Sequence, residues 1–90
     1  MTTYAISYDL HKKDGFDYTN LIDAIKAYPN WCHHLESDWV VTSDKTAEQI
    51  RDDLLRHIHK DDKLIVFKLA REAAWYGLSD KISDWLKNNL

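Results

Sequence analysis

An aspartate at the end of an expected first strand is the residue of this sequence best suited to metal chemistry. The segment Tyr4–Leu10 is typical of a β-strand, and it carries Asp9 to its C-terminal tip before a polar loop begins. Magnesium prefers carboxylate oxygens and needs one or two protein carboxylates beside water and a phosphate. Asp9 is therefore our candidate metal ligand and catalytic residue, because a bound metal can activate water against a phosphate ester. The alternative is that Asp9 starts a turn, as aspartate often does at strand ends.

The loop that follows Asp9 carries side chains that fit the same chemistry. Lys12 and Lys13 are candidate contacts for the phosphates of a nucleic acid near the metal. His11 belongs to the residue type that titrates near neutral pH, which suits a general acid or base. The alternative for all three residues is an ordinary solvated loop.

The cysteine and the other histidines argue against a zinc site. Cys32, His33 and His34 are consecutive, and on a strand His33 and His34 point to opposite faces. A tetrahedral site would then need two more ligands from elsewhere, and the sequence has no Cys-x-x-Cys pair. His57 and His59, near the end of a second expected helix, are better explained by contact with its negative end.

The tryptophans offer a third chemistry, because aromatic rings can stack on the bases of single-stranded nucleic acid. Trp85 lies on an apolar helical stripe, and Trp31 and Trp39 flank an expected hairpin, where aromatic pairs stabilise sheets. For these three residues packing is the better explanation. Trp75 precedes a turn at Gly77, where we expect an interface role.

The composition indicates one small domain over residues 1–90. The chain is 44% hydrophobic and 30% charged, as in a folded protein that dissolves well. A net charge of −3 argues against a broad basic surface for nucleic acid, while a local patch stays open. The single cysteine excludes an internal disulfide, and no signal peptide or membrane-length apolar run is recognisable. We expect a cytoplasmic protein without membrane contact.

The elements that must position Asp9 follow the order strand, helix, strand, strand, helix, strand. Pro29 ends the first helix, and Thr46 with Gln49 forms a capping box at the start of the second. With short connections, this order predicts a ferredoxin-like βαββαβ fold of the α+β class, with a four-stranded antiparallel sheet and two helices on one face. Ser79 is the expected cap of a short C-terminal helix. We expect strands over residues 4–10, 31–36, 39–43 and 63–69, and helices over residues 18–28, 46–60 and 79–89.

This fold leaves one face of the sheet without helices, and there we place a homodimer interface. The two-residue period of a strand turns Asp9 to that face and Tyr4, Ile6 and Tyr8 to the core. Strand 63–69 is too continuously apolar for one wet face, so we expect both its faces to be covered. At a two-fold axis the two copies of Asp9 would meet and share a magnesium ion. The expected interface residues are Ala5, Ser7, Leu64, Val66, Trp75 and Tyr76.

The strand end Tyr8-Asp9-Leu10, a second acid at Asp14 and the split βαβ order together resemble a known family. The chain resembles the small CRISPR-associated endoribonuclease of the adaptation complex and the related virulence-associated protein D toxins. It resembles most the small bacterial proteins labelled as SinR-family, through Trp39, the Asp61-Asp62 pair and the Trp-x-Gly-Leu-like turn after Ala74. The resemblance covers the architecture of residues 3–69. It implies a homodimer that cleaves RNA or duplex DNA with a metal bound by the strand-one aspartate, here Asp9.

The chain departs from that family at two places. Residues 16–19 read Phe-Asp-Tyr-Thr where the family often has arginines. The family's extra strand, which crosses to the partner subunit, is replaced here by the expected helix 79–89. Two hypotheses therefore stand side by side. The first is a magnesium-dependent nuclease, and the second is a non-catalytic dimeric interaction module or a toxin–antitoxin component of the same fold. A small-molecule sensor rests on analogy of fold alone.

Overall fold

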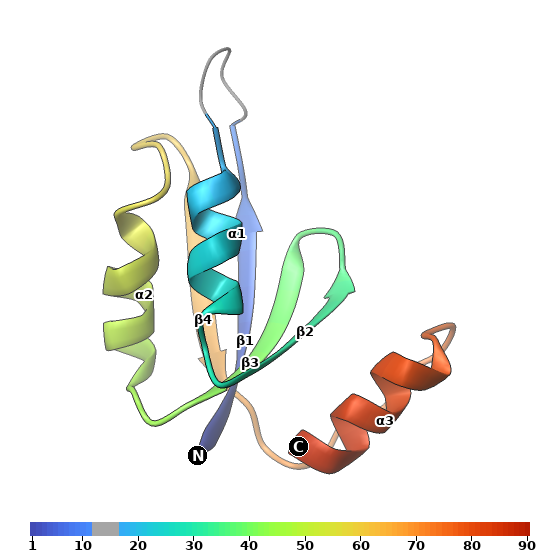
Figure 1. The fold of residues 1–90 in the computed structure, drawn as a ribbon. Helices are drawn as coiled ribbons and strands as arrows, with labels where there is room; N and C mark the ends of the chain where they lie inside the picture. The colour runs from blue at the N-terminus through green and yellow to red at the C-terminus, as the bar shows by residue number, and fades with distance from the viewer. Residues whose placement is uncertain (12–16) are drawn as a thin grey trace.

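A computed structural model describes residues 1–11 and 17–90, which form a four-stranded sheet and three helices (Figure 1). The sheet has the order β2-β3-β1-β4, and every neighbouring pair is antiparallel. The helices α1 and α2 cover one of its faces, so the expected ferredoxin-like α+β class is confirmed. No helix within the described ranges is both long and apolar enough to cross a membrane. The elements are β1 Thr2–Asp9, α1 Thr19–Lys26, β2 Asn30–Leu35, β3 Asp38–Ser43, α2 Ala47–Leu55, β4 Lys63–Lys68 and α3 Asp80–Asn89.

Local hydrogen bonds fix where the helices begin. The Thr46 hydroxyl accepts from the Gln49 amide at 3.2 Å, and the Gln49 side chain accepts from the Thr46 amide at 2.9 Å, which is the expected capping box. Ser79 caps α3 as expected, accepting from the Ile82 amide. At α1 the cap position is held by Tyr18, whose side chain makes no capping hydrogen bond, and the carboxylate of Asp17 before it accepts from the Thr19 amide at 2.8 Å.

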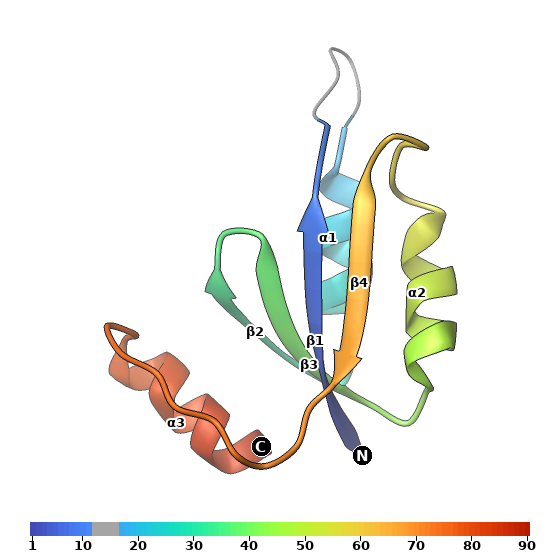
Figure 2. The ribbon, with the colours of Figure 1, turned by 180° about the vertical axis from the view of Figure 1, so that it is seen from behind.

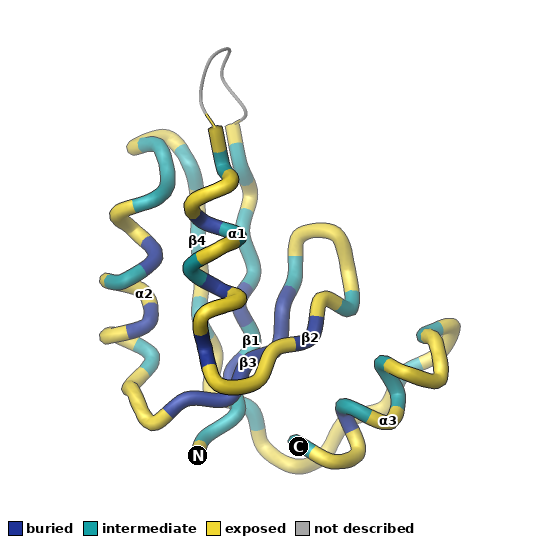
Figure 3. Tube along the Cα trace, in the orientation of Figure 1, coloured by how far each residue is buried: buried dark blue, intermediate teal, exposed yellow. Residues whose placement is uncertain are grey.

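The main core lies between the sheet and the two helices α1 and α2 (Figure 3). Alternate residues of β1 and β3 point into it, because the side chains of a strand alternate between faces. Trp39 is fully buried there, and its indole N–H donates to the Tyr8 hydroxyl at 3.0 Å, so the largest core side chain has no unsatisfied polar atom. The other fully buried side chains are Ile6, Leu21, Ile25, Val41, Ile50 and Leu54.

The structure corrects the placement of Leu64 and Val66. Leu64 pairs with Tyr8 and Val66 with Ile6, and paired residues of antiparallel strands share a face, so both pack against the core under the helices. The prediction that they lie on the uncovered face is wrong. In a strand whose residues are all apolar, the sequence does not show which of the two alternating sets of side chains faces the core. A shift of the strand register by one residue exchanges the two sets.

The face of the sheet opposite α1 and α2, called the open face, therefore carries the other residues of β4. Ile65 pairs with Ser7 and Phe67 pairs with Ala5 on that face. Ile65 is 46% exposed and Phe67 is 55% exposed. Within the described chain no element covers Ile65 and Phe67, so the cover expected for this face would have to come from a second copy, which stays a prediction.

Helix α3 covers the other half of the open face, over β2 and β3. Figure 2 shows the chain after β4 running past the end of the sheet to α3, which lies beside β2. Leu86 of α3 forms a second buried cluster with Cys32 and Val40, and Trp75 and Trp85 pack against it. Trp75 is thus part of the α3 packing, while Tyr76 beside it is fully exposed.

Candidate functional site

Asp9 lies on the open face at the C-terminal end of β1, as the strand period predicts. Its carboxylate is exposed and makes no hydrogen bond or ion pair with any residue that the structure describes. A shallow hollow of about 290 Å³ lies beside it, lined by residues of β1 and β4 that include Ser7, Lys63 and Ile65. We call this the Asp9 hollow. The carboxylate is therefore free to bind a ligand.

A second carboxylate stands at the same end of the sheet. Asp38 pairs with Ser7 across β1 and β3, and the Ser7 hydroxyl donates to its carboxylate. Asp38 is consequently the diagonal neighbour of Asp9 on the open face, and such neighbours lie roughly 7–8 Å apart. The expected strands 31–36 and 39–43 left Asp38 between them, so the sequence did not predict its side chain on the sheet face. The alternation of Asp38, Val40 and Thr42 within β3 was the signal that could have placed it.

The single unengaged carboxylate of Asp9 fits magnesium better than a metal that needs several protein ligands. In residues 1–11 and 17–90 no three His, Cys, Asp or Glu side chains converge on one point. Magnesium is commonly held by one or two carboxylates, with water completing its six positions. Asp9 supplies one unengaged carboxylate, so an ion shared with a second copy of Asp9 would match that requirement.

Lys63 lies directly opposite Asp9 in the pairing of β1 and β4. A lysine at this position partly balances the charge of Asp9 and opposes the binding of a cation. It also offers a contact for a phosphate. The predicted phosphate contacts Lys12 and Lys13, and with them Asp14, lie outside the described residues.

The expected loop histidine, His11, is held through its backbone. Its amide donates to the Asp62 carboxylate at 2.6 Å, and the Tyr18 hydroxyl and the His59 amide donate to the same carboxylate. Partial burial raises the pKa of Asp62, but these hydrogen bonds lower it by more, so the net pKa lies below its usual value. Asp62 thus connects the end of β1 to α1 and to the chain after α2.

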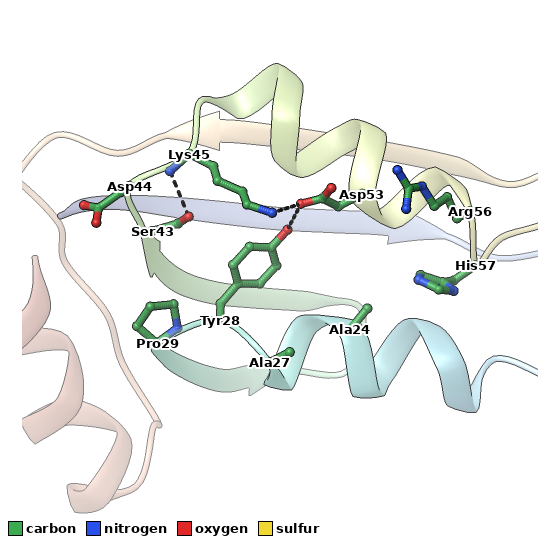
Figure 4. A pocket seen from close by; sticks show the side chains of 10 residues that line it. All are labelled: Ala24, Ala27, Tyr28, Pro29, Ser43, Asp44, Lys45, Asp53, Arg56 and His57. Atoms are coloured by element: carbon green, nitrogen blue, oxygen red, sulfur yellow. Dashed lines mark hydrogen bonds and ion pairs between the residues drawn. The ribbon is translucent and has the colours of Figure 1, made fainter.

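A groove between α1 and α2 is a second candidate site (Figure 4). It has a volume of about 490 Å³ and is lined by both helices and the segment after β3. The Asp53 carboxylate accepts from Lys45 at 2.6 Å and from the Tyr28 hydroxyl at 3.2 Å. The hydrogen bond from Lys45 is the main cause of the lowered pKa of Asp53, while burial and Asp53 raise the pKa of Tyr28. This carboxylate is already satisfied.

The far end of that groove holds Arg56 and His57 at the C-terminal end of α2. Neither side chain forms a hydrogen bond or an ion pair with any residue that the structure describes. The groove therefore combines a neutralised carboxylate with two available cationic or titratable groups.

The cysteine and histidines of β2 are separated by the sheet. Cys32 is buried under α3, and this burial raises the pKa of its thiol. Burial also lowers the pKa of His34, although the nearby Asp38 raises it. His33 lies on the other side and stacks on Trp39, with ring centroids 3.7 Å apart. The opposite directions of His33 and His34 are those that the strand period predicts.

The resemblance to the CRISPR-associated endoribonuclease family stays a prediction. Comparisons with protein-family models, with curated proteins and with solved structures found no match for this chain.

Proposed function

We propose that the protein is a homodimeric, magnesium-dependent nuclease in which Asp9 of each subunit holds one shared ion. The observation that carries this proposal is the exposed, unengaged carboxylate of Asp9 on the half of the open face that α3 leaves bare. Ile65 and Phe67 on the same half supply apolar surface for a second copy. A magnesium ion bound there would activate water and stabilise the departing oxygen of a phosphodiester.

The residues around Asp9 have distinct roles in this proposal. Asp9 binds the metal, and the hydrogen bond from Ser7 holds Asp38 in place as a second negative group at that end of the sheet. Lys63 balances Asp9 before the metal binds and then contacts a phosphate of the substrate. Lys12 and Lys13 extend the contact to the backbone of RNA or DNA, the proposed substrates.

A specific observation favours a second candidate function. Lys63 opposite Asp9 reduces the attraction for a cation, whereas the exposed Ile65 and Phe67 beside them form a surface suited to a protein partner. The second candidate is therefore a non-catalytic dimeric interaction module, or a toxin–antitoxin component, with the same fold.

A cleavage assay with magnesium separates the two candidates. RNA and duplex DNA are incubated with the wild-type protein, with Asp9→Ala and with Asp23→Ala, a control that removes an exposed carboxylate from α1. We expect the wild type and the control to cleave, and Asp9→Ala to fall to the level of buffer, because the metal loses its protein ligand. Chelation should stop cleavage and added magnesium should restore it. Equal activity of the wild type and Asp9→Ala, or no cleavage by either, would exclude the nuclease.

A further inference from the structure

The groove between α1 and α2 exists because α1 presents small side chains to its neighbour. Ala24 and Ala27 line it from α1, and their methyl groups leave a space of about 490 Å³ beside α2 (Figure 4). This volume falls within the range of roughly 300–1,000 Å³ that small-molecule sites occupy. Tyr28 and Pro29, which follow α1, extend the same wall, so this wall is mostly apolar. We call this space the α1–α2 groove.

The α1–α2 groove has an excess of positive charge at the end where α2 stops. The hydrogen bond from Lys45 to Asp53, at 2.6 Å, is the main cause of the lowered pKa of Asp53. The charge of Arg56 lowers that pKa further, so two cations act on one carboxylate. Asp44, the other carboxylate that lines the groove, lies at the opposite end from Arg56 (Figure 4).

Arg56 and His57 have donors that no described acceptor uses. Neither side chain forms a hydrogen bond or an ion pair with a residue that the structure describes. The negative end of α2 offsets only part of their charge, because a helix dipole is equivalent to about half an elementary charge. A guanidinium carries five N–H donors in a planar fork, and a neutral imidazole still donates through one ring nitrogen. This end of the groove therefore complements an anion with several acceptor oxygens.

We infer that the α1–α2 groove binds a small organic phosphate. Its phosphate group pairs with Arg56 and His57, and its organic part lies along the alanines of α1. A phosphate monoester offers three acceptor oxygens, so it accepts from both side chains at once, whereas a carboxylate has two. The apolar wall selects a carbon skeleton over a bare phosphate ion. The inference does not rest on the proposed nuclease, because the groove and Asp9 lie on opposite sides of the sheet.

Titration of the full chain without metal, followed by the NMR signals of its backbone amides, tests the inference. Phenyl phosphate is the probe. Inorganic phosphate lacks the organic part, phenol lacks the phosphate, and benzoate carries a carboxylate in its place. We expect phenyl phosphate to shift the amides of Ala27, Arg56 and His57 and to bind more tightly than the other three ligands. Shifts confined to other parts of the chain, or equal binding of inorganic phosphate or benzoate, would overturn the inference.

Substitutions in the groove have matched controls outside it. Arg56→Gln should weaken binding of phenyl phosphate by about tenfold or more, because a charge-assisted hydrogen bond is lost. Arg51→Gln removes an arginine of the same helix that pairs with Asp52, and it should bind like the wild type. Ala27→Leu fills the groove from an exposed position and should also weaken binding, whereas Ala73→Leu, at an exposed position elsewhere, should not. Unchanged affinity in Arg56→Gln would overturn the inference.

A pair of charge variants separates a site in the groove from general attraction of an anion to the chain. Asp53→Asn removes the carboxylate that holds Lys45 and should strengthen binding by about threefold or more, since Lys45 is then free to contact the phosphate. Asp52→Asn changes the net charge equally outside the groove and should have a smaller effect. Lys63→Gln should bind like the wild type, whatever the outcome of the cleavage assay. A gain in Asp53→Asn no larger than that in Asp52→Asn would contradict the proposed site.

Discussion

At the scale of single residues, the Asp62 side chain joins three segments of the described chain. Its carboxylate accepts hydrogen bonds from the His11 amide, the Tyr18 hydroxyl and the His59 amide. These donors come from the end of β1, the start of α1 and the segment before β4. A carboxylate accepts such bonds more strongly than a neutral oxygen. Asp62 should therefore stabilise the fold in its ionised form.

The lowered pKa of Asp62 gives this stabilisation a defined pH dependence. A carboxyl group whose pKa is lower in the folded state contributes above its unfolded value, and the contribution is lost as the pH falls through the folded value. We expect Asp62→Asn to cost about 1 kcal/mol at neutral pH, and the difference from the wild type to shrink below about pH 4. Urea unfolding at a series of pH values measures this. Tyr18→Phe should show part of the effect, and a constant difference at all pH values would contradict the assignment.

The position of a single residue could be predicted where a local sequence pattern determined which face of the sheet it occupies. The strand period placed Asp9 on the open face, because Ile6 and Tyr4 beside it are unambiguous core residues. The same period failed for Leu64 and Val66, since the alternate residues Ile65 and Phe67 are also apolar. The burial of Cys32 could not be predicted, because it depends on where α3 docks.

At the scale of elements, α3 is an addition to the ferredoxin-like arrangement, and it converts part of the open face into a second core. Its residue Leu86 is buried against Cys32 and Val40. The cap at Ser79 made the helix predictable from sequence, because a capping signal is local. Its docking site was not predictable, since the apolar stripe of a helix does not specify which surface it will cover.

The thiol of Cys32 reports whether α3 is docked. We expect Leu86→Ala to increase the rate at which Cys32 reacts with an aromatic disulfide reagent, because the substitution leaves a cavity and weakens the contact that buries the thiol. Lys87→Ala changes the adjacent, exposed residue and should react like the wild type. Reaction rates under native conditions measure the effect. Identical rates for Leu86→Ala and the wild type would show that α3 does not control access to Cys32.

At the scale of the whole molecule, the bare half of the open face is the surface that the proposed homodimer would bury. Its apolar residues Ile65 and Phe67 form a continuous strip along β4, with Lys63 at one end. The sequence predicted that a second copy covers this face, and the register of β1 and β4 turns Ile65 and Phe67 toward it in place of Leu64 and Val66. The correction follows from the register of β1 and β4, which is a property of the folded sheet.

Disruption of this strip tests the dimer. We expect Phe67→Lys to convert a dimer into a monomer, because an unpaired charge at the centre of an apolar contact is costly to bury. Leu55→Lys adds the same charge at an exposed leucine of α2, on the opposite side, and should leave the mass unchanged. Sedimentation equilibrium gives the mass of each variant. A monomeric wild type, or a dimer in Phe67→Lys, would contradict the proposed interface.

The contact between the start of β1 and the end of α3 has a consequence for the order of folding. The Thr3 hydroxyl donates to the carbonyl oxygen of Asn89 at 2.6 Å, across a separation of 86 residues. Closing so long a loop is entropically unfavourable until the strands between have paired. We therefore expect α3 to dock last and to leave first. The intermediate without it would expose the whole sheet face, Cys32 included, so a nascent chain would pass through a state with more apolar surface than the native protein shows.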